Sequence, residues 1–424
     1  MRPALVATLV LLLAPVTTAQ SPADADVQRV RSHPKFVQAI AALDADHDRL
    51  VNEIVTLTEI PAPPFAEDAR GAAYLEMLRA HGLSNVERDA EGNVMGLRRG
   101  SGNGPLIAIA AHLDTVFPAG TDVTVTREGT RLSAPGIGDD TRSLAVLLAM
   151  IRAMDAAGIQ TEADILFIGN VGEEGLGDLR GMKYLFQKGP YRDRISTFIS
   201  MDGAGGGDDI THGGVGSKRY RVTFKGPGGH SYGAFGLVSP AFAMGLAMAK
   251  FSDVTVPETP KTTFNVGVVG GGTSVNSIPF ESWMEVDMRS QAPAELQKLE
   301  ETFRRLMQEA ADEENRLRST AQGRIEAELT LVGDRPSGAT PLDSRLVQVA
   351  AASVRAMGMT PRFSYSSTDS NIPISLGIPA ITIDSGGRGG RAHALDEWID
   401  VEKASSLRGI ESAMTLLLTL AGVR

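Results

Sequence analysis

LIAIAAHLDTVFP, at residues 106–118, predicts a buried β-strand that ends in polar side chains. Small and β-branched apolar residues run without a polar break up to His112 and Asp114, which suits a strand covered on both faces of a parallel sheet. In open α/β sheets, ligands bind at the carboxyl ends of such strands. A His followed two residues later by Asp can supply a metal ligand and a residue that orients it. Because such triplets also arise by chance at the rim of a sheet, a site requires further ligands from elsewhere in the chain.

Three more apolar runs are each followed by acidic or histidine side chains. ADILFIG at residues 163–169 leads into NVGEEGLGD, which holds Glu173 and Glu174. Residues 197–201 lead to Asp202 in SMDG, and residues 380–383 lead into a glycine-rich loop that contains His393. Adjacent carboxylates at the rim of a core are costly unless a cation compensates them. We therefore expect an α/β fold built on an open, mostly parallel sheet, with these side chains at the strand ends.

The segment APGIGDD, residues 134–140, adds two more candidate ligands. Its glycines predict a tight turn, and the apolar spacing that follows predicts a helix ending near Gly158. Asp139 and Asp140 precede this helix, where a single Asp would serve as an N-cap. The pattern alone does not choose which of the two carboxylates joins the site.

Two imidazoles and three carboxylates suit two adjacent divalent ions, for which zinc is the expected metal and cobalt or manganese the alternatives. The predicted ligands are His112, one of Asp139 and Asp140, Glu174, Asp202 and His393. Two ions about 3.5–4 Å apart can lower the pKa of a bridging water to about 7 and polarise the carbonyl of an amide. Glu173, next to a ligand, is then placed as general base, a role worth about 10²- to 10⁴-fold in rate. Each side chain alone would be interpreted as structural or solvated, and their coincidence at strand ends favours a site.

The middle of the chain predicts an inserted domain. Between residues 216 and 334, alternating strands and amphipathic helices follow the order βαββαβ of a ferredoxin-like sandwich. We expect it to interrupt a catalytic domain made of residues 24–215 and 335–424. Helical periodicity runs over residues 24–57, and residues 86–99 predict a hairpin.

The N-terminus predicts export. Residues 1–19 contain one Arg, a short apolar core and small residues before a cleavage site, as in a secretory signal peptide. We therefore expect a secreted or periplasmic protein without stable membrane association after cleavage; an uncleaved anchor is the alternative. The chain has no Cys, so neither disulfides nor a catalytic thiol is available. Its net charge of −10 and the lack of a basic patch argue against nucleic acid as a partner.

The motifs AHLDTVFP, GIGDD, GEEG and SMDG, followed by the late His393, resemble in order and spacing those of the M20 family of metallopeptidases. That family includes glutamate carboxypeptidase, peptidase T and deacylases of acetylornithine and succinyl-diaminopimelate. By this resemblance, one metal lies on His112 and Asp202. The other lies on Glu174 and His393, and Asp139 bridges the two ions.

The resemblance also implies roles for neighbouring residues. Asp114 would orient the first histidine ligand, and Glu173 would be the general base. The family's usual lysine two positions after the bridging Asp is Thr141 here, with Arg142 beside it. This departure implies a change in the groups that support the ligands and leaves the ligands themselves unchanged.

The inserted domain resembles the family's lid and dimerisation domain. GPGGHSYGAFG places His230 where the family often has a His that reaches the reacting carbonyl, in dimers from the neighbouring subunit. Asn276 and Arg289 lie where the family binds a carboxylate or backbone of the substrate, a task that suits the bidentate fork of Arg. Structural alternatives are that His230 is a turn residue and that Arg289 pairs with Asp287 or Glu285. A homodimer through the inserted domain is a further expectation.

The function expected from these features is metal-dependent hydrolysis of amide bonds in short peptides. Asp202 is the residue typical of the aminopeptidases and dipeptidases of the family, whereas its carboxypeptidases and deacylases typically have Glu. This favours a di- or tripeptidase or an aminopeptidase. The alternatives are a carboxypeptidase or a deacylase of N-acyl amino acids, and, from a different class, a non-catalytic protein that binds peptides or metal.

Overall fold

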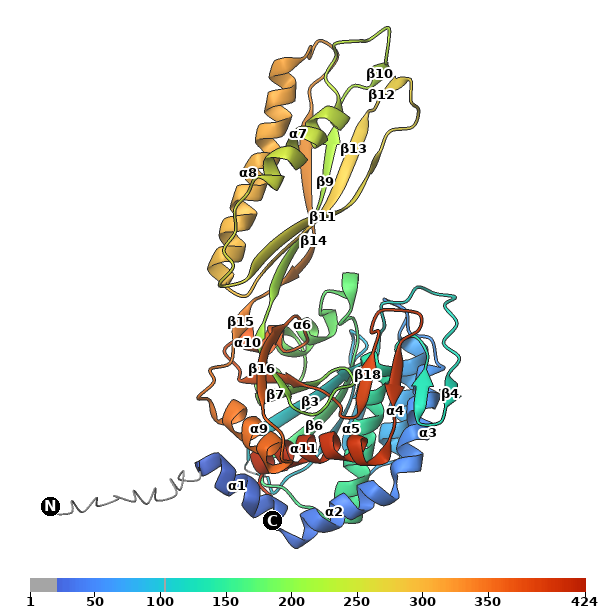
Figure 1. The fold of residues 1–424 in the computed structure, drawn as a ribbon, viewed down its shortest axis with the longest axis vertical. Helices are drawn as coiled ribbons and strands as arrows, with labels where there is room; N and C mark the ends of the chain where they lie inside the picture. Colours follow the sequence, from blue (N-terminus) through green and yellow to red (C-terminus); the bar gives the residue numbers. More distant parts are fainter. Residues whose placement is uncertain (1–20, 103) are drawn as a thin grey trace, which may run out of the picture.

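The computed structural model describes residues 21–102 and 104–424, which fold into two bodies joined end to end (Figure 1). The predicted signal peptide, residues 1–19, lies outside the described residues. The larger body is built on a nine-stranded sheet in the order β1-β2-β6-β3-β7-β17-β8-β15, with β16 paired to β8. Its central strands run parallel and are β6 (Asp164–Asn170), β3 (Leu106–His112), β7 (Ile195–Met201) and β17 (Ala380–Ile383). This confirms the predicted α/β fold with a mainly parallel sheet.

Strand β3 is apolar throughout because its two faces enter different cores. Ile107 and Ile109 pack into a core shared with α5 (Arg142–Ala156), α9 (Arg345–Ala356) and α11 (Lys403–Ala421). Ala108 and Ala110 face the opposite core, which contains α6 (Arg180–Gln187) and α10 (Asn371–Ser375). Side chains alternate across a strand, so a strand between two helix layers needs apolar residues at every position. The chain then leaves this layer at His112, the first polar side chain.

The flanking strands of the large sheet are mostly antiparallel. The expected hairpin is confirmed as β1 (Ser84–Arg88) and β2 (Val94–Arg98). Its turn is held by Asp89, whose carboxylate accepts the backbone N–H groups of residues 91, 92 and 93 at 2.9–3.0 Å. At the other edge lie β8 (Asp209–Gly214), β15 (Gly338–Ala339) and β16 (Arg362–Ser366).

The helical periodicity of residues 24–57 corresponds to three helices, where a single pattern had been expected. They are α1 (Pro22–Arg31), α2 (Pro34–Ala45) and α3 (His47–Thr58), followed by α4 (Asp68–Arg79). The first break occurs because Pro34 has no N–H to donate and disfavours a helical residue before it. His33 is accordingly extended, and its Nδ1 accepts the N–H of Lys35 at 3.2 Å. The hydrophobic spacing persists across the break because α1, α2 and α3 pack on the same core.

The smaller body contains residues between Gly216 and Arg335. In chain order it comprises β9 (Gly216–Lys225), α7 (Pro240–Ser252), β11 (Thr262–Gly271), β13 (Glu281–Ser290), α8 (Pro293–Leu317) and β14 (Glu326–Arg335). The strands form an antiparallel sheet in the order β11-β13-β9-β14, and α7 and α8 share a separate core with it. The short strands β10 (Gly229–His230) and β12 (Ser277–Ile278) pair at the end that points away from the larger body (Figure 1).

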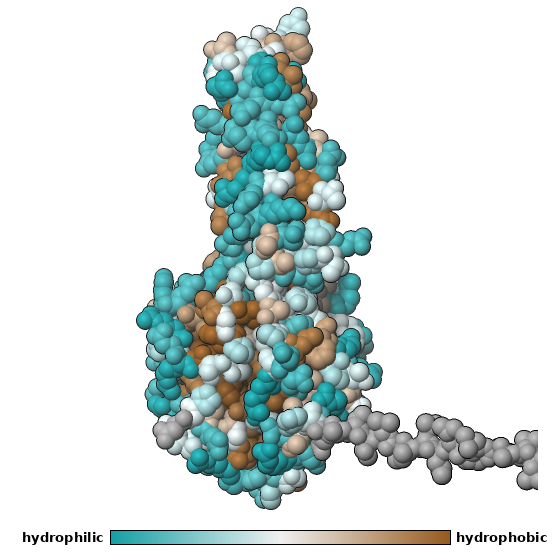
Figure 2. All heavy atoms as spheres, turned by 90° about the vertical axis from the view of Figure 1, so that its left-hand side faces the viewer, coloured by the Kyte–Doolittle hydropathy of each residue, from teal (hydrophilic) through white to brown (hydrophobic). Residues whose placement is uncertain are grey.

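The long helix α8 is amphipathic, as its apolar spacing predicts. Leu296, Leu299 and Phe303 are buried against the sheet of the smaller body. The view in Figure 2, from the side on which α8 lies in Figure 1, is mostly hydrophilic over this body. Hydrophobic residues gather instead on the larger body in the same view. Within the described residues, no helix is long and apolar enough to cross a membrane.

A four-stranded sheet at the side of the larger body joins two distant parts of the chain. Its order is β18 (Arg388–Gly390), β19 (Trp398–Asp400), β5 (Arg131–Ser133) and β4 (Thr126–Glu128). The pairing of β19 with β5 brings the late glycine-rich loop beside the turn η1 (Ile137–Thr141). The sheet therefore brings together two segments that were predicted to carry metal ligands.

Candidate metal centre and active site

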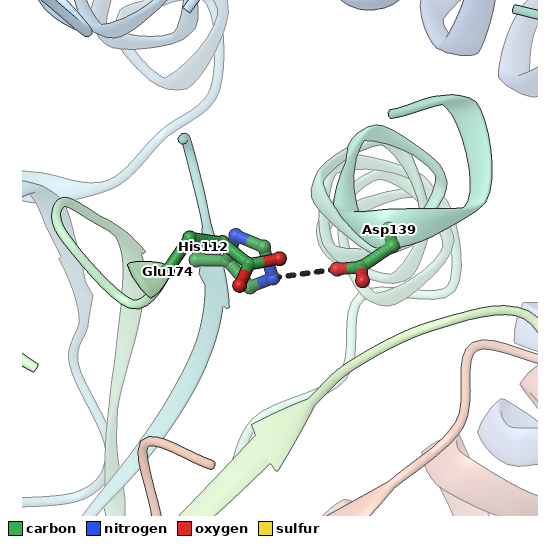
Figure 3. A group of neighbouring side chains, drawn as sticks. All are labelled: His112, Asp139 and Glu174. Carbon is green, nitrogen blue, oxygen red and sulfur yellow. Dashed lines mark hydrogen bonds and ion pairs between the residues drawn. The ribbon is translucent and has the colours of Figure 1, made fainter. Parts of the chain in front are cut away.

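The five predicted metal ligands come from separate segments that meet at the carboxyl ends of the central strands. His112 ends β3, and Glu174 and Asp202 follow β6 and β7 within a few residues. Asp139 lies in η1, and His393 lies between β18 and β19. Figure 3 shows His112 directed at Asp139, with Glu174 alongside. The position agrees with the usual location of ligands in open α/β sheets.

Asp139 lies between the two imidazoles. Its Oδ1 is 2.9 Å from His112 Nε2, and its Oδ2 is 3.1 Å from His393 Nε2. His393 Nε2 is also 2.9 Å from Glu174 Oε1, and His112 Nε2 is 3.9 Å from Asp202 Oδ1. Each imidazole therefore faces Asp139 and one further carboxylate.

This donor set fits a pair of divalent ions. Imidazole nitrogen and carboxylate oxygen are ligands that zinc accepts. Candidate ligand atoms of His112, Asp139 and Glu174 lie within 4.8 Å of one another. Each oxygen of Asp139 faces a different imidazole, which is the position that a bridging carboxylate would need.

The charges around the cluster are those of a cation site. Hydrogen bonds to Asp139 and Glu174 raise the pKa of His393 to about 10. Burial opposes the charged form of His112, but its hydrogen bond to Asp139 and the nearby carboxylates raise its pKa well above the ordinary value. Burial, followed by the charge of Asp139, raises the pKa of Asp202 to about 7. Positive charge is thus strongly favoured between these carboxylates.

Asp140 has a different role from Asp139. Its carboxylate accepts the backbone N–H of His112 at 3.0 Å and that of Gly203 at 3.1 Å. It therefore ties the end of β3 to the loop after β7. The expectation that one of the two Asp residues caps the next helix is wrong, because the N-cap of α5 is Thr141.

Asp114 contacts both His112 and the loop after β6. Its backbone carbonyl lies 2.9 Å from His112 Nδ1, and a proton on Nδ1 would leave Nε2 as the metal-binding nitrogen. The side-chain carboxylate accepts the N–H groups of Glu173 at 3.1 Å and Glu174 at 2.8 Å. The carbonyl is thus the closer group to His112, and the carboxylate holds the Glu173–Glu174 backbone.

Glu173 is buried and paired with an arginine that the sequence patterns do not single out. Arg335, at the end of β14, donates from Nη1 to Glu173 Oε1 at 3.1 Å and from Nη2 to the carbonyl of Glu173. Burial raises the pKa of Glu173 well above its ordinary value, and the charge of Arg335 opposes this rise. The two residues are 162 positions apart, so neither periodicity nor local spacing relates them.

A cavity of about 390 Å³ lies over the cluster, and its walls come from both bodies. Asp139, Glu173, Glu174, Asp202 and His393 line it from the larger body. Three arginines face it from the other side: Arg219 on β9, Arg289 on β13 and Arg335 on β14. Arg219 and Arg289 also share one carboxylate, since both donate to Asp287, at 3.1 and 2.6 Å. The alternative that Arg289 pairs with Asp287 is confirmed, and Arg289 also lines the cavity over the predicted ligands.

The other two residues predicted in the smaller body lie away from this cavity. His230 is exposed in β10, and its Nδ1 accepts the N–H groups of Tyr232 and Gly233 at 3.2 and 3.3 Å. Asn276 precedes β12, and its carbonyl accepts the N–H of Ser231 at 2.9 Å. Strands β10 and β12 lie at the far end of the smaller body (Figure 1). A catalytic role of His230 at the metal cluster of its own chain therefore does not fit this arrangement, and a role at a neighbouring subunit stays a prediction.

Thr141 and Arg142 occupy the place where the family's lysine was expected. The Thr141 hydroxyl lies 2.6 Å from that of Thr58 and 2.9 Å from the carbonyl of Gly136. Arg142 is fully buried, and its three guanidinium nitrogens have no hydrogen-bond partner among the described residues. Burial lowers the pKa of Arg142 to about 10. Neither side chain belongs to the ligand cluster.

Comparison with known proteins finds a curated relative and solved structures of the same fold. A curated relative, succinyl-diaminopimelate desuccinylase of Leptothrix cholodnii, is 26% identical over 278 residues, which cover 61% of this chain and 72% of the relative. The crystal structure of aminopeptidase PepT from Bacillus cereus has a TM-score of 0.71 at 21% identity and covers 88% of this chain and 99% of its own. A dinuclear metal binding peptidase of Bacillus subtilis has a TM-score of 0.63 at 18% identity, covering 89% of this chain and 99% of its own.

The family model matches residues 108–419, which include all five predicted ligands. The matched span starts inside β3 and ends inside α11, so it contains the central sheet, the smaller body and the late His393 loop. The chain belongs to peptidase family M20/M25/M40 and is a metallopeptidase-type hydrolase.

Proposed function

We propose that this protein hydrolyses peptide bonds in short peptides with two divalent ions, as a di- or tripeptidase or an aminopeptidase. The observation that carries the proposal is the position of Asp139, whose two oxygens each face a different imidazole. In the proposed arrangement, His112 and Asp202 hold one ion and His393 and Glu174 hold the other. Zinc is the expected metal, because its ligand preferences match these donors.

The bound ions would supply Lewis-acid activation of a water molecule and of the substrate carbonyl. Glu173 would take the proton of the attacking water and pass it to the leaving amine. Burial raises the pKa of Glu173 above that of an ordinary carboxylate, which makes it a stronger base for this proton transfer. Arg335 would keep the carboxylate of Glu173 directed at the cavity.

The three arginines of the cavity support recognition of a substrate carboxylate. We assign this role first to Arg289, whose side chain is 40% exposed and whose terminal nitrogens have no hydrogen-bond partner among the described residues. The same arginines also favour the second candidate function, that of a carboxypeptidase or deacylase of N-acyl amino acids. The likeness to a desuccinylase supports that alternative, and the likeness to an aminopeptidase supports the first.

We further propose that residues 216–334 form a ferredoxin-like lid that interrupts a catalytic domain of residues 24–215 and 335–424. The strand and helix order of the smaller body and its three arginines at the cavity support this division. Dimerisation through the lid would give the exposed His230 and Asn276 a partner subunit on which to act. Export by the segment at residues 1–19 belongs to the same proposal.

Replacement of Glu173 by Gln tests the mechanism. The carboxamide keeps the size of the side chain but takes up no proton, so hydrolysis should fall by about 10²- to 10⁴-fold while the metal content stays the same. Metal analysis and release of amino acids from free, N-blocked and C-amidated peptides measure both effects and identify the class of substrate. Glu91→Gln is a matched control, because Glu91 also pairs with an arginine, Arg180, outside the cavity. Near-normal hydrolysis by Glu173→Gln would reject the proposed base.

A further inference from the structure

Glu397 directly precedes β19, and its carboxylate accepts three backbone hydrogen bonds from the turn that carries Asp139. Glu397 is buried, with only 2% of the residue exposed. Oε1 accepts the N–H groups of Gly138 and Asp139, both at 2.8 Å, and Oε2 accepts the N–H of Gly136 at 2.9 Å. Both carboxylate oxygens are therefore engaged by the turn that carries Asp139.

The backbone N–H and carbonyl groups of Glu397 are hydrogen-bonded as well. The N–H of Ala134 donates to the carbonyl of Glu397 at 3.0 Å, directly beside the pairing of β19 with β5. The N–H of Glu397 in turn donates to the carbonyl of Ala394, the residue after His393, at 3.0 Å. Glu397 thus connects the segment that presents His393 to the turn that presents Asp139, whose side chains lie 3.1 Å apart.

The turn is shaped to receive a carboxylate. A Cβ atom at Gly138 would lie 3.0 Å from Glu397 Oε1 and 3.1 Å from Ile399 Cγ2, so a side chain there would press on the contact. Gly136 adopts a φ of +76°, which favours glycine, and a Cβ there would lie 2.5 Å from Thr115 Cγ2. Three converging donors require an acceptor with two oxygens and no proton of its own, which Glu supplies when ionised.

We propose that Glu397 is a positioning residue that holds Asp139 between His112 and His393 and so sets the affinity of the metal site. This inference rests on the proposed two-metal function. Because Asp139 would serve both ions, an error in its position would weaken both. Groups that orient metal ligands typically change metal affinity by about 10- to 100-fold when they are replaced.

Zinc affinity, measured by competition with a chromophoric chelator, tests this role without recourse to activity. Glu397→Ala removes all three acceptor contacts and should weaken zinc binding by about 10- to 100-fold. Glu397→Gln should weaken it less, because its carbonyl oxygen can still accept from Gly138 and Asp139 while its amide opposes the N–H of Gly136. With cobalt in place of zinc, the absorption spectrum of the bound ion should change in both variants.

Two further variants keep the test decisive. Gly138→Ala disturbs the same contact from the opposite side and should weaken zinc binding in the same direction, even if Glu397→Ala fails to fold. Glu402→Ala is the matched control: Glu402 accepts the N–H groups of Ala404 and Ser405 at 2.9 and 2.8 Å at the start of α11, away from the ligands. The zinc affinity of Glu402→Ala should equal that of the unmodified chain, even if this variant loses thermal stability.

Two results would overturn the inference in distinguishable ways. Equal zinc affinities for the unmodified chain, Glu397→Gln and Gly138→Ala would reject the positioning role and leave the two-metal proposal intact. Failure of the unmodified chain to bind zinc would reject the proposed function and, with it, this inference.

Discussion

At the level of single residues, the pair Glu173–Arg335 governs the proposed proton transfer. Glu173 is buried beside Glu174, and burial disfavours its ionised form. Arg335, only 4% exposed, supplies the compensating charge and also holds the backbone of Glu173 through its carbonyl. Because Arg335 donates to both the carboxylate and the backbone carbonyl of Glu173, it fixes the position of Glu173 and also compensates its charge.

Arg335→Met should therefore move the pH dependence of hydrolysis. Loss of the positive charge raises the pKa of Glu173 further, so the fraction of ionised base at a given pH falls. The acidic limb of the kcat/KM profile should shift to higher pH, and Arg335→Lys, which keeps the charge, should shift it less. Superimposable acidic limbs in the unmodified chain and Arg335→Met would contradict the coupling of these two residues.

At the level of elements, Asp178 connects the loop after β6, which carries Glu173 and Glu174, to β14, the last strand of the smaller body. Its carboxylate accepts the N–H of Asp334, in β14, at 3.0 and 3.1 Å. Arg219, on the neighbouring strand β9, donates to the carbonyl of Gly175 at 2.8 Å in the same loop. Two strands of the smaller body are thus hydrogen-bonded to the segment that carries Glu173 and Glu174.

Asp178→Ala should loosen this junction. A hydrogen bond to a charged acceptor is worth about 1.5–3 kcal/mol, so loss of the one from Asp334 should lower the free energy of unfolding by about 1.5–3 kcal/mol. Hydrogen exchange should become faster at the amide of Asp334. Asp193→Ala is the control, since Asp193 pairs with Arg192 on the surface and is 84% exposed. Unchanged exchange at Asp334 would show that this contact does not hold the two bodies together.

Elements whose patterns are local could be predicted from the sequence, and contacts between distant segments could not. The apolar strands, the hairpin and α8 follow from periodicity, and the polar residues predicted at strand ends lie close together in the structure. The break at Pro34 could not be predicted from the helical periodicity, because α1 and α2 pack on one core and keep a common spacing of apolar residues. Arg335 and Glu397 have no periodicity to mark them, since their partners lie 162 and up to 261 positions away.

At the scale of the whole molecule, the two bodies divide the predicted site residues. Four of the five predicted ligands line one cavity together with Glu173 and Arg289, whereas His230 and Asn276 lie at the opposite end of the smaller body. Exposed aromatic side chains flank this end, with Tyr232 at 89% and Phe235 at 87% exposure. If the cavity of a second copy faced this end, His230 would lie at a cavity other than its own.

Complementation between inactive variants tests this arrangement. If His230 acts across a dimer, a mixture of Glu173→Gln and His230→Ala chains should recover part of the activity, because one of the two sites in each heterodimer would be intact. Either variant alone supplies the baseline. No recovery in an isolated heterodimer would exclude action of His230 on the neighbouring site.

The central claim is that two ions sharing Asp139 carry out the hydrolysis. Titration of zinc into the metal-free protein, with dipeptide hydrolysis as the readout, tests it most directly. We predict no hydrolysis without metal and a plateau once two ions are bound per chain. Hydrolysis by the metal-free protein, or full activity with a single ion bound, would contradict the account.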